Sequence, residues 1–456
     1  MMDRGGAGIS QLCATSGNDY KQSDDRTDSS KSGRYWHGTV RQVNAPLPYI
    51  QKRNEFYPAS DACSASHPKG HSVKPVDDFK ALITHEKVDC LLRVSTHYGD
   101  RYDGKKHSQF AISIKQYTAA SKRPLHHSEQ RQLIPLLHDF KATPGWTWRS
   151  LTTTFHSFTS AGVFTFHKYM EEWVKETQAA LLSTLLDQVL LKCNQKPEAR
   201  HLDVQGINNL LWSVAKLVGN GLALEKAPKL KEVMVALLIH VKAKARLPEE
   251  REHFIPQHIA NLVWSVAKLV DSGLELDKTR VLREAVAALL PHVIAKAESE
   301  KYHFIPQHIA ILLWAVTKLV DKGLEKTPTL KGAVAALLPH VKTKAESKEE
   351  KDHFNTQGVA NLLWALAKLV DNGLELEKIP TLKVAVAALL PLMKTKIEST
   401  EEKDQFKLQE VASLQWALAK LVDNGLSLER TPKLKETVGA VLIHVEAKSK
   451  EEKNHF

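Results

Sequence analysis

The chain has few cysteines and no long apolar run. Among its 456 residues, the four cysteines form no C-x-x-C pair. Their scarcity argues against a disulfide framework or a zinc site and fits a reducing compartment. No stretch reaches the about 18 consecutive apolar residues of a membrane span, and the N-terminus lacks the apolar segment of a secretory signal peptide. We therefore expect an intracellular, soluble protein with no membrane partner, although the Ser-, Gly- and Asp-rich start also suits non-classical export.

Motifs that carry catalysis are missing as well. The sequence contains no G-x-x-x-x-G-K-[ST], G-x-S-x-G or H-E-x-x-H segment, and we predict that the protein is not an enzyme and needs no cofactor. Histidine recurs late in each repeated unit, at His240, His292, His340 and His444. A metal site needs ligands that converge, so we interpret these separated copies as surface residues.

The excess of positive charge is small where the sequence repeats. Lysine and arginine number 63 against 52 aspartates and glutamates, for a formal net charge of +11. Residues 201–456 hold 36 basic and 32 acidic side chains, a surplus of only 4. This balance argues against unspecific electrostatic binding to nucleic acid along the repeats.

Three regions differ in composition. Residues 1–80 are rich in Ser, Asp, Gly, Lys and Pro without a sustained period, and we predict a disordered arm. Residues 81–200 are mixed and partly helical, and "SLTTTFHSFTSAGVF" aligns loosely with the later units as a decayed repeat. Residues 201–456 contain five units of about 50 residues. A fixed period of this length is typical of a solenoid.

Each unit is expected to form two helices. The first follows a glutamine and ends before a glycine suited to a left-handed C′ position, such as Gly373. The second begins near Thr-Pro pairs that suit an N-cap and N1, as at Thr327 and Pro328. Pro291, Pro339 and Pro391 should kink or end it. Because one helix pair cannot bury its own apolar surface, the units predict an all-α fold: an α-solenoid of two-helix repeats, a HEAT/armadillo-like superhelix.

A polar stripe follows one face of each first helix. At about 100° per residue, glutamine, asparagine, tryptophan and lysine of each unit fall together, opposite a broad apolar arc. The candidate binding residues are Gln205, Asn209, Trp212, Lys216, Gln257, Asn261, Trp264, Lys268, Gln307, Trp314, Lys318, Gln357, Asn361, Trp364, Lys368, Gln409, Trp416 and Lys420. Stacked units would align these groups in ladders, because packed helices lie about 8–10 Å apart.

Two interpretations of the stripe remain open. In the structural one, the indole lies against the next repeat with its N–H bonded to a glutamine, and lysine pairs with the aspartate three residues later. In the functional one, indoles stack on bases, amides contact base edges and lysines meet phosphates of single-stranded RNA.

At "QGVANLLWALAKLVDNG", the chain resembles the octotricopeptide and FAST-kinase-like helical repeats, which carry a similar Leu-Trp-Ala-Leu-Ala-Lys core. The resemblance covers residues 201–456. It implies a right-handed α-solenoid and contact with RNA through the Gln, Asn and Lys positions of the stripe.

The Ser-rich start followed by near-identical units with "ANLL" cores also resembles tandem helical-repeat effectors that plant-associated bacteria deliver by type III secretion. That resemblance implies a host protein as the partner and an export signal in the arm. Finally, the last unit would leave an uncapped end, and an exposed apolar face there predicts self-association.

Overall fold

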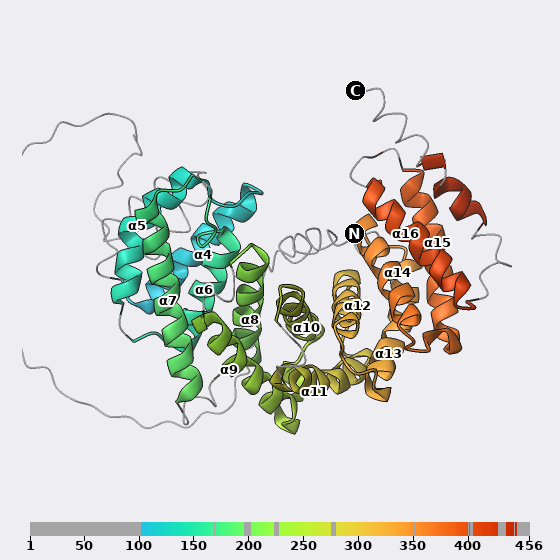
Figure 1. Ribbon diagram of the computed structural model, residues 1–456, viewed down its shortest axis with the longest axis horizontal. Coiled ribbons are helices and arrows are strands. Elements are labelled where there is room, and N and C mark those ends of the chain that lie inside the picture. Colours follow the sequence, from blue (N-terminus) through green and yellow to red (C-terminus); the bar gives the residue numbers. More distant parts are fainter. Residues whose placement is uncertain are drawn as a thin grey trace, which may run out of the picture. The chain divides into compact units, whose positions relative to one another are not determined.

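The protein is an all-α solenoid in which helix pairs stack one after another (Figure 1). The computed structural model describes residues 102–143, 145–167, 169–195, 202–222, 228–274, 280–349, 352–399, 401, 405–426, 435–441 and 443–444. All of them belong to one compact unit. The predicted disordered arm, residues 1–80, lies outside the described residues. No strand occurs in the described ranges.

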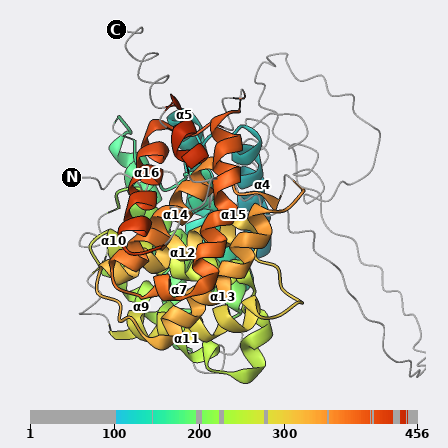
Figure 2. The same ribbon diagram turned by 90° about the vertical axis from the view of Figure 1, so that its right-hand side faces the viewer.

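Alternate helices form two layers, and each helix packs on the next member of its own layer. The first-helix layer contains α4 (Gly104–Ala120), α6 (Trp148–Ala161), α8 (Val204–Gly219), α10 (Pro256–Asp271), α12 (Pro306–Asp321), α14 (Thr356–Asp371) and α16 (Leu408–Asp423). The second-helix layer contains α5 (His127–Ala142), α7 (Glu172–Asn194), α9 (Pro228–Ala245), α11 (Arg280–Ala297), α13 (Pro328–Ala345) and α15 (Pro380–Ile397). Short 3-10 helices η4 (Pro248–His253) and η6 (Leu376–Lys378) lie in the connections. Figure 2 turns α15 and α16 toward the viewer.

The stack begins before the regular repeats. Helices α4 to α7 come from the region whose sequence showed only a loosely aligned, decayed repeat. Helix α6 ends at Gly162, whose φ of 82° is left-handed, and it packs between α4 and α8. The same glycine position closes the later first helices, as at Gly273 with φ 99° and Gly373 with φ 76°. Since glycine adopts positive φ without a Cβ clash, the period of the turn survives where the helix sequence has diverged.

The second helices run past their internal prolines. α11, α13 and α15 continue beyond Pro291, Pro339 and Pro391 for another six residues. Of the two outcomes expected, a kink or an end of the helix, the second is wrong. All three proline rings are exposed to solvent. Proline has no N–H for the carbonyl four residues earlier, and at an exposed position water can bond to that carbonyl instead. The Thr-Pro prediction is confirmed, because Thr327 caps α13 by accepting a hydrogen bond from the backbone N–H of Leu330 at 3.2 Å.

A column of phenylalanines joins the layers. One phenylalanine precedes the first helix of four repeats, and each is at most 2% exposed: Phe254, Phe304, Phe354 and Phe406. Two of these rings contact the histidine of their own second helix, with centroid distances of 4.7 Å to His292 and 5.6 Å to His340. Burying one such ring stabilises the fold by about 1.5–3 kcal/mol. The column fixes how each pair of helices closes over the core.

Candidate binding stripe

The polar stripe is the most accessible line of the first-helix layer. In α14 the apolar arc, exemplified by Leu362 and Leu366, is fully buried, whereas Gln357 and Asn361 are partly exposed. The same division holds in α10, where Gln257 is partly exposed. The orientation inferred from helical periodicity is therefore correct for the glutamine and asparagine positions. What the stripe can bind depends on which of its groups are engaged within the stack.

Three of the five indoles are closed off between repeats. Trp212, Trp264 and Trp314 are 6%, 0% and 2% exposed, whereas Trp364 and Trp416 are only partly buried. The continuous stacking platform that the RNA interpretation needs is thus absent from the first three repeats. Trp264 Nε1 is buried with no hydrogen-bond partner among the described residues, so the indole–glutamine bond of the structural interpretation is not made there either.

The lysines of the stripe pair with aspartates of the preceding repeat. Lys318 Nζ lies 3.7 Å from Asp271, Lys368 Nζ lies 3.7 Å from Asp321, and Lys420 Nζ lies 3.2 Å from Asp371. The pairing expected three residues along the same helix is the weaker contact, at 4.0 Å between Lys368 and Asp371. These lysines therefore balance a ladder of carboxylates, and their charge is not available in full to phosphates.

Lysines of the stripe also lie over its indoles. Lys318 Nζ is 5.8 Å from the ring centroid of Trp314 and 5.7 Å from that of Trp364. Lys268, which is only 8% exposed, lies 5.8 Å from the Trp314 ring. Such cation–π contacts are worth about 0.5–1 kcal/mol at exposed sites and more when buried. Ammonium groups of the chain itself thus lie over the rings of Trp314 and Trp364.

An uncharged histidine of α6 packs on the first indole of the stripe. The His156 ring packs on Trp212 at a centroid distance of 5.0 Å. Burial, with a smaller contribution from nearby Lys115, lowers the pKa of His156 to about 3. The imidazole is therefore neutral at physiological pH and serves as an aromatic packing partner.

The remaining candidate residues of the stripe differ in exposure and in hydrogen bonding. The outermost glutamines, Gln205 and Gln409, are exposed, while Gln307 is partly exposed. Asn209 and Asn261 each accept the hydroxyl of the serine four residues later through their backbone carbonyls, at 2.7 Å. Lys216 is partly exposed near the end of α8.

The outer face of α16 is small and polar. Ala412, Gln415 and Ala419 are exposed on it. Gln415 stands where the other repeats bury an apolar side chain, at Leu211, Val263, Leu313 and Leu363. The apolar surface on which the expectation of self-association rested is accordingly reduced at this helix.

The recurring histidines hold neighbouring repeats together instead of lying free on the surface. Nε2 of His240, His292 and His340 is 3.1, 2.7 and 2.8 Å from the carbonyl oxygens of Cys193, Ala245 and Ala297. Each acceptor lies at or next to the end of the preceding second helix, where carbonyls have no partner within the helix. The interpretation as surface residues is therefore wrong. A hint was present in the sequence, because these histidines sit among the apolar residues of the second helix.

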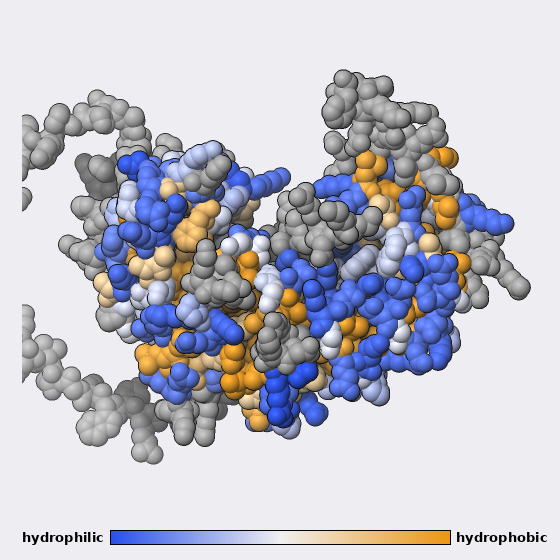
Figure 3. All heavy atoms as spheres, in the orientation of Figure 1, coloured by the Kyte–Doolittle hydropathy of each residue, from blue (hydrophilic) through white to orange (hydrophobic). Residues whose placement is uncertain are grey.

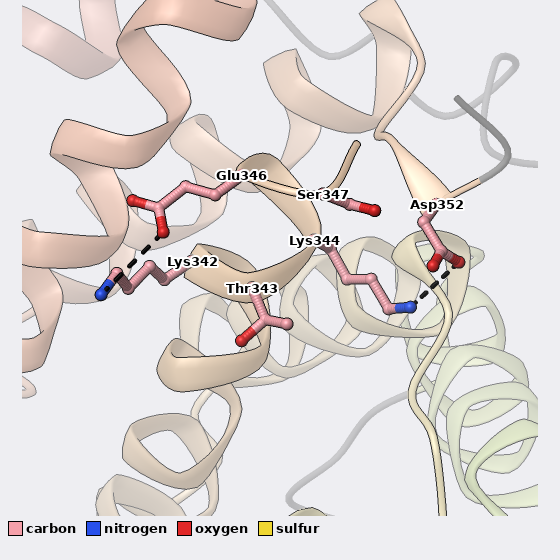
Figure 4. A pocket seen from close by; sticks show the side chains of 6 residues that line it. All are labelled: Lys342, Thr343, Lys344, Glu346, Ser347 and Asp352. Atoms are coloured by element: carbon pink, nitrogen blue, oxygen red, sulfur yellow. Dashed lines mark ion pairs between the residues drawn. The ribbon is translucent and has the colours of Figure 1, made fainter. Parts of the chain in front are cut away.

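A polar hollow lies at the end of α13. A shallow hollow of about 370 Å³ at the end of α13 is lined by polar and charged side chains (Figure 4). Two of its lysines are paired, Lys342 with Glu346 at 3.9 Å and Lys344 with Asp352 at 3.0 Å. Figure 3 shows hydrophilic residues over α13 and more hydrophobic surface over α9. Within the described ranges, no three metal-binding side chains converge, and no helix is long and apolar enough to cross a membrane.

Fold and stripe together define a helical-repeat protein. No protein-family model matches the chain, and no curated protein matches it. The resemblances to octotricopeptide-like repeats and to type III effectors therefore stay predictions.

Proposed function

We propose that the protein is a non-catalytic scaffold that binds another protein along its first-helix layer, with Trp364 and Trp416 as the anchoring side chains. One observation carries the proposal: these are the two indoles of the stripe that stay partly exposed, and they lie beside lysines that pair with aspartates of the preceding repeat. Tryptophan is enriched among the few residues that dominate protein–protein affinity, because its large rigid ring buries much area at small entropic cost.

Charge balance favours a protein partner over RNA. Binding to a polyanion gains its free energy from lysines that release counterions from phosphates. Lys368 and Lys420 already contact Asp321 and Asp371, so a phosphate approaching them would also meet these carboxylates. A surface whose lysines and aspartates pair with each other, and which carries partly exposed indoles, instead resembles a protein interface, in which tryptophan is enriched.

A peptide-display selection on the immobilised full-length chain tests the proposal. Peptides selected by the wild type should lose at least about tenfold in affinity for a Trp416→Ala variant. Trp173→Ala supplies a matched control, because Trp173 is an exposed indole of α7 in the other layer, 46% exposed. Circular dichroism checks that both variants keep their helices. Equal loss in the two variants, or none in either, would overturn the assignment of the anchors.

RNA binding is the competing outcome, and a titration with random single-stranded RNA at two salt concentrations measures it. We expect no change in fluorescence anisotropy at micromolar protein. Salt-sensitive binding that drops in a Lys318→Ala, Lys368→Ala, Lys420→Ala variant would support the RNA interpretation and reject a protein-only scaffold.

A further inference from the structure

The first helices differ in how their N-termini are capped. In α8, Asp203 Oδ1 accepts a hydrogen bond from the backbone N–H of Gly206 at 2.6 Å, and in α14 Asn355 Oδ1 accepts one from Gly358 at 2.7 Å. Helices α10 and α12 instead follow an isoleucine that makes no side-chain cap, with proline as their first residue. In α12 the backbone N–H of His308 donates to the carbonyl oxygen of Ile305 at 3.0 Å, not to a side chain. Without an acidic or polar side-chain cap, a helix N-terminus keeps its partial positive charge.

A histidine occupies the third position of each uncapped helix. His258 of α10 and His308 of α12 stand where α8 and α14 have Gly206 and Gly358. His258 is 8% exposed, and its Nδ1 is 2.9 Å from the carbonyl oxygen of His253. His308 is partly buried, and its Nδ1 is enclosed with no hydrogen-bond partner among the described residues.

The two histidines belong to one interface. Helices α10 and α12 pack directly on each other, and the residues hold the same position in both, so a charge on His258 acts on His308. The other titratable groups that act on His258 are Asp203 at the start of α8 and His253 of η4. Asp203, the single acid among them, is already engaged by the N–H of Gly206.

We propose that the α10–α12 interface is an acid-sensitive joint of the solenoid. Near neutral pH both imidazoles are uncharged and pack between the helices. On acidification, protonation of His258 and His308 places two like charges at two helix ends without side-chain caps inside one interface, and this interface loosens whereas the α14–α16 interface does not.

The direction of the titration agrees with this geometry. Burial lowers the pKa of His308 to about 4 and lowers the pKa of His258 below its ordinary value. A histidine whose folded-state pKa lies below the unfolded value of about 6.5 binds its proton more readily in the unfolded chain. Stability is therefore fully present above about pH 6.5 and declines as pH falls toward 4, by up to about a factor of ten in the unfolding equilibrium per histidine and pH unit.

The α14–α16 interface responds in the opposite sense. Glu410 of α16 occupies the same helix position, and burial raises its pKa above the ordinary value. A carboxyl group with a raised folded-state pKa takes up a proton more easily in the folded chain, so mild acid does not weaken this interface through Glu410. The α14–α16 interface can therefore serve as a control for the α10–α12 interface within the same molecule.

Hydrogen–deuterium exchange of the full chain, followed by mass spectrometry at about pH 7.5 and about pH 5 with correction for intrinsic exchange rates, tests the joint. We expect amides of α10 and α12 to exchange at least about tenfold faster at the lower pH, while those of α14 and α16 keep their protection. A His258→Gly, His308→Gly variant, which uses the residues found in α8 and α14, should abolish the difference.

If the double glycine variant does not fold, a single substitution with a smaller structural effect tests the same proposal. In His308→Gln, an uncharged side chain of similar size replaces the imidazole, and the pH effect on α10 and α12 should shrink. Equal acid-induced exchange in every first helix would overturn the proposal. So would an unchanged pH effect in the folded histidine variants.

Discussion

Lys318 shows how one side chain can connect three repeats. Its ammonium group contacts Asp271 of the preceding repeat and lies over the indoles of Trp314 and Trp364, one of its own repeat and one of the next. A partly exposed ion pair contributes about 0.2–1 kcal/mol, and the cation–π contacts add a similar amount. The sum is modest, but its recurrence keeps successive helices in register.

Cys193 gives a prediction at the same scale. Its side chain is 7% exposed, and burial raises the pKa of the thiol to about 12. Because the thiolate is the nucleophile, we expect iodoacetamide to modify Cys193 at neutral pH at least about 100-fold more slowly in the folded protein than in denaturant. Peptide mass spectrometry reads the modified fraction. Equally fast labelling in both states would mean that the end of α7 opens readily.

At the scale of a helix, α8 lacks one rung of the aspartate ladder. Gly219 stands where α10, α12 and α14 carry Asp271, Asp321 and Asp371. A Cβ at Gly219 would lie 3.8 Å from Cε of Lys268, an ordinary contact. Substitution Gly219→Asp should raise the free energy of unfolding by about 1 kcal/mol, since it removes a flexible helical glycine and adds a carboxylate near Lys268.

Urea denaturation followed by circular dichroism measures this change, and Gly221→Asp is the control. Gly221 has a φ of 98°, a left-handed conformation that costs an aspartate about 1 kcal/mol or more. The two neighbouring substitutions should therefore act in opposite directions. A destabilising Gly219→Asp would show that Lys268 cannot reach a carboxylate at this position.

The helices themselves follow from local patterns, and the contacts between them do not. Apolar positions that recur every three to four residues, and the glycine after each first helix, predict the paired helices, because both signals are local in the sequence. The partner of Lys368, by contrast, is Asp321 in the preceding repeat, and its identity depends on how the helices are offset when they stack. Periodicity placed Trp264 on the polar stripe but could not show that stacking buries its ring completely.

Packing also explains why the sequence of α4 to α7 aligned only loosely with the later units. Helix α6 keeps Gly162 but has no tryptophan–lysine core, and it buries hydroxyl-bearing side chains such as Thr154 and Ser157. Packing against α4 and α8 imposes the layer position. Tertiary contacts of this kind leave no fixed spacing in the sequence.

For the whole molecule, stability is a sum of repeat terms and nearest-neighbour interface terms. Whether a further helix can pack on α16 therefore depends on how apolar the exposed face of α16 is. Gln415 is exposed on α16, between Ala412 and Ala419, whereas Leu363 at the same place in α14 is buried. Substitution Gln415→Leu would create an apolar strip like the one that joins α14 to α16. We expect the variant to self-associate and the wild type to stay at a constant mass over the same concentrations.

Sedimentation velocity at about 1 to 100 μM protein measures the difference, since apolar contacts of this size give weak association. Gln409→Leu is the matched control, because Gln409 is also exposed on α16 but belongs to the polar stripe. Mass that rises with concentration in Gln415→Leu alone would identify Gln415 as the side chain that blocks stacking on this face. Self-association of the wild type would instead show that Ala412, Gln415 and Ala419 allow a second copy of the chain to pack on α16.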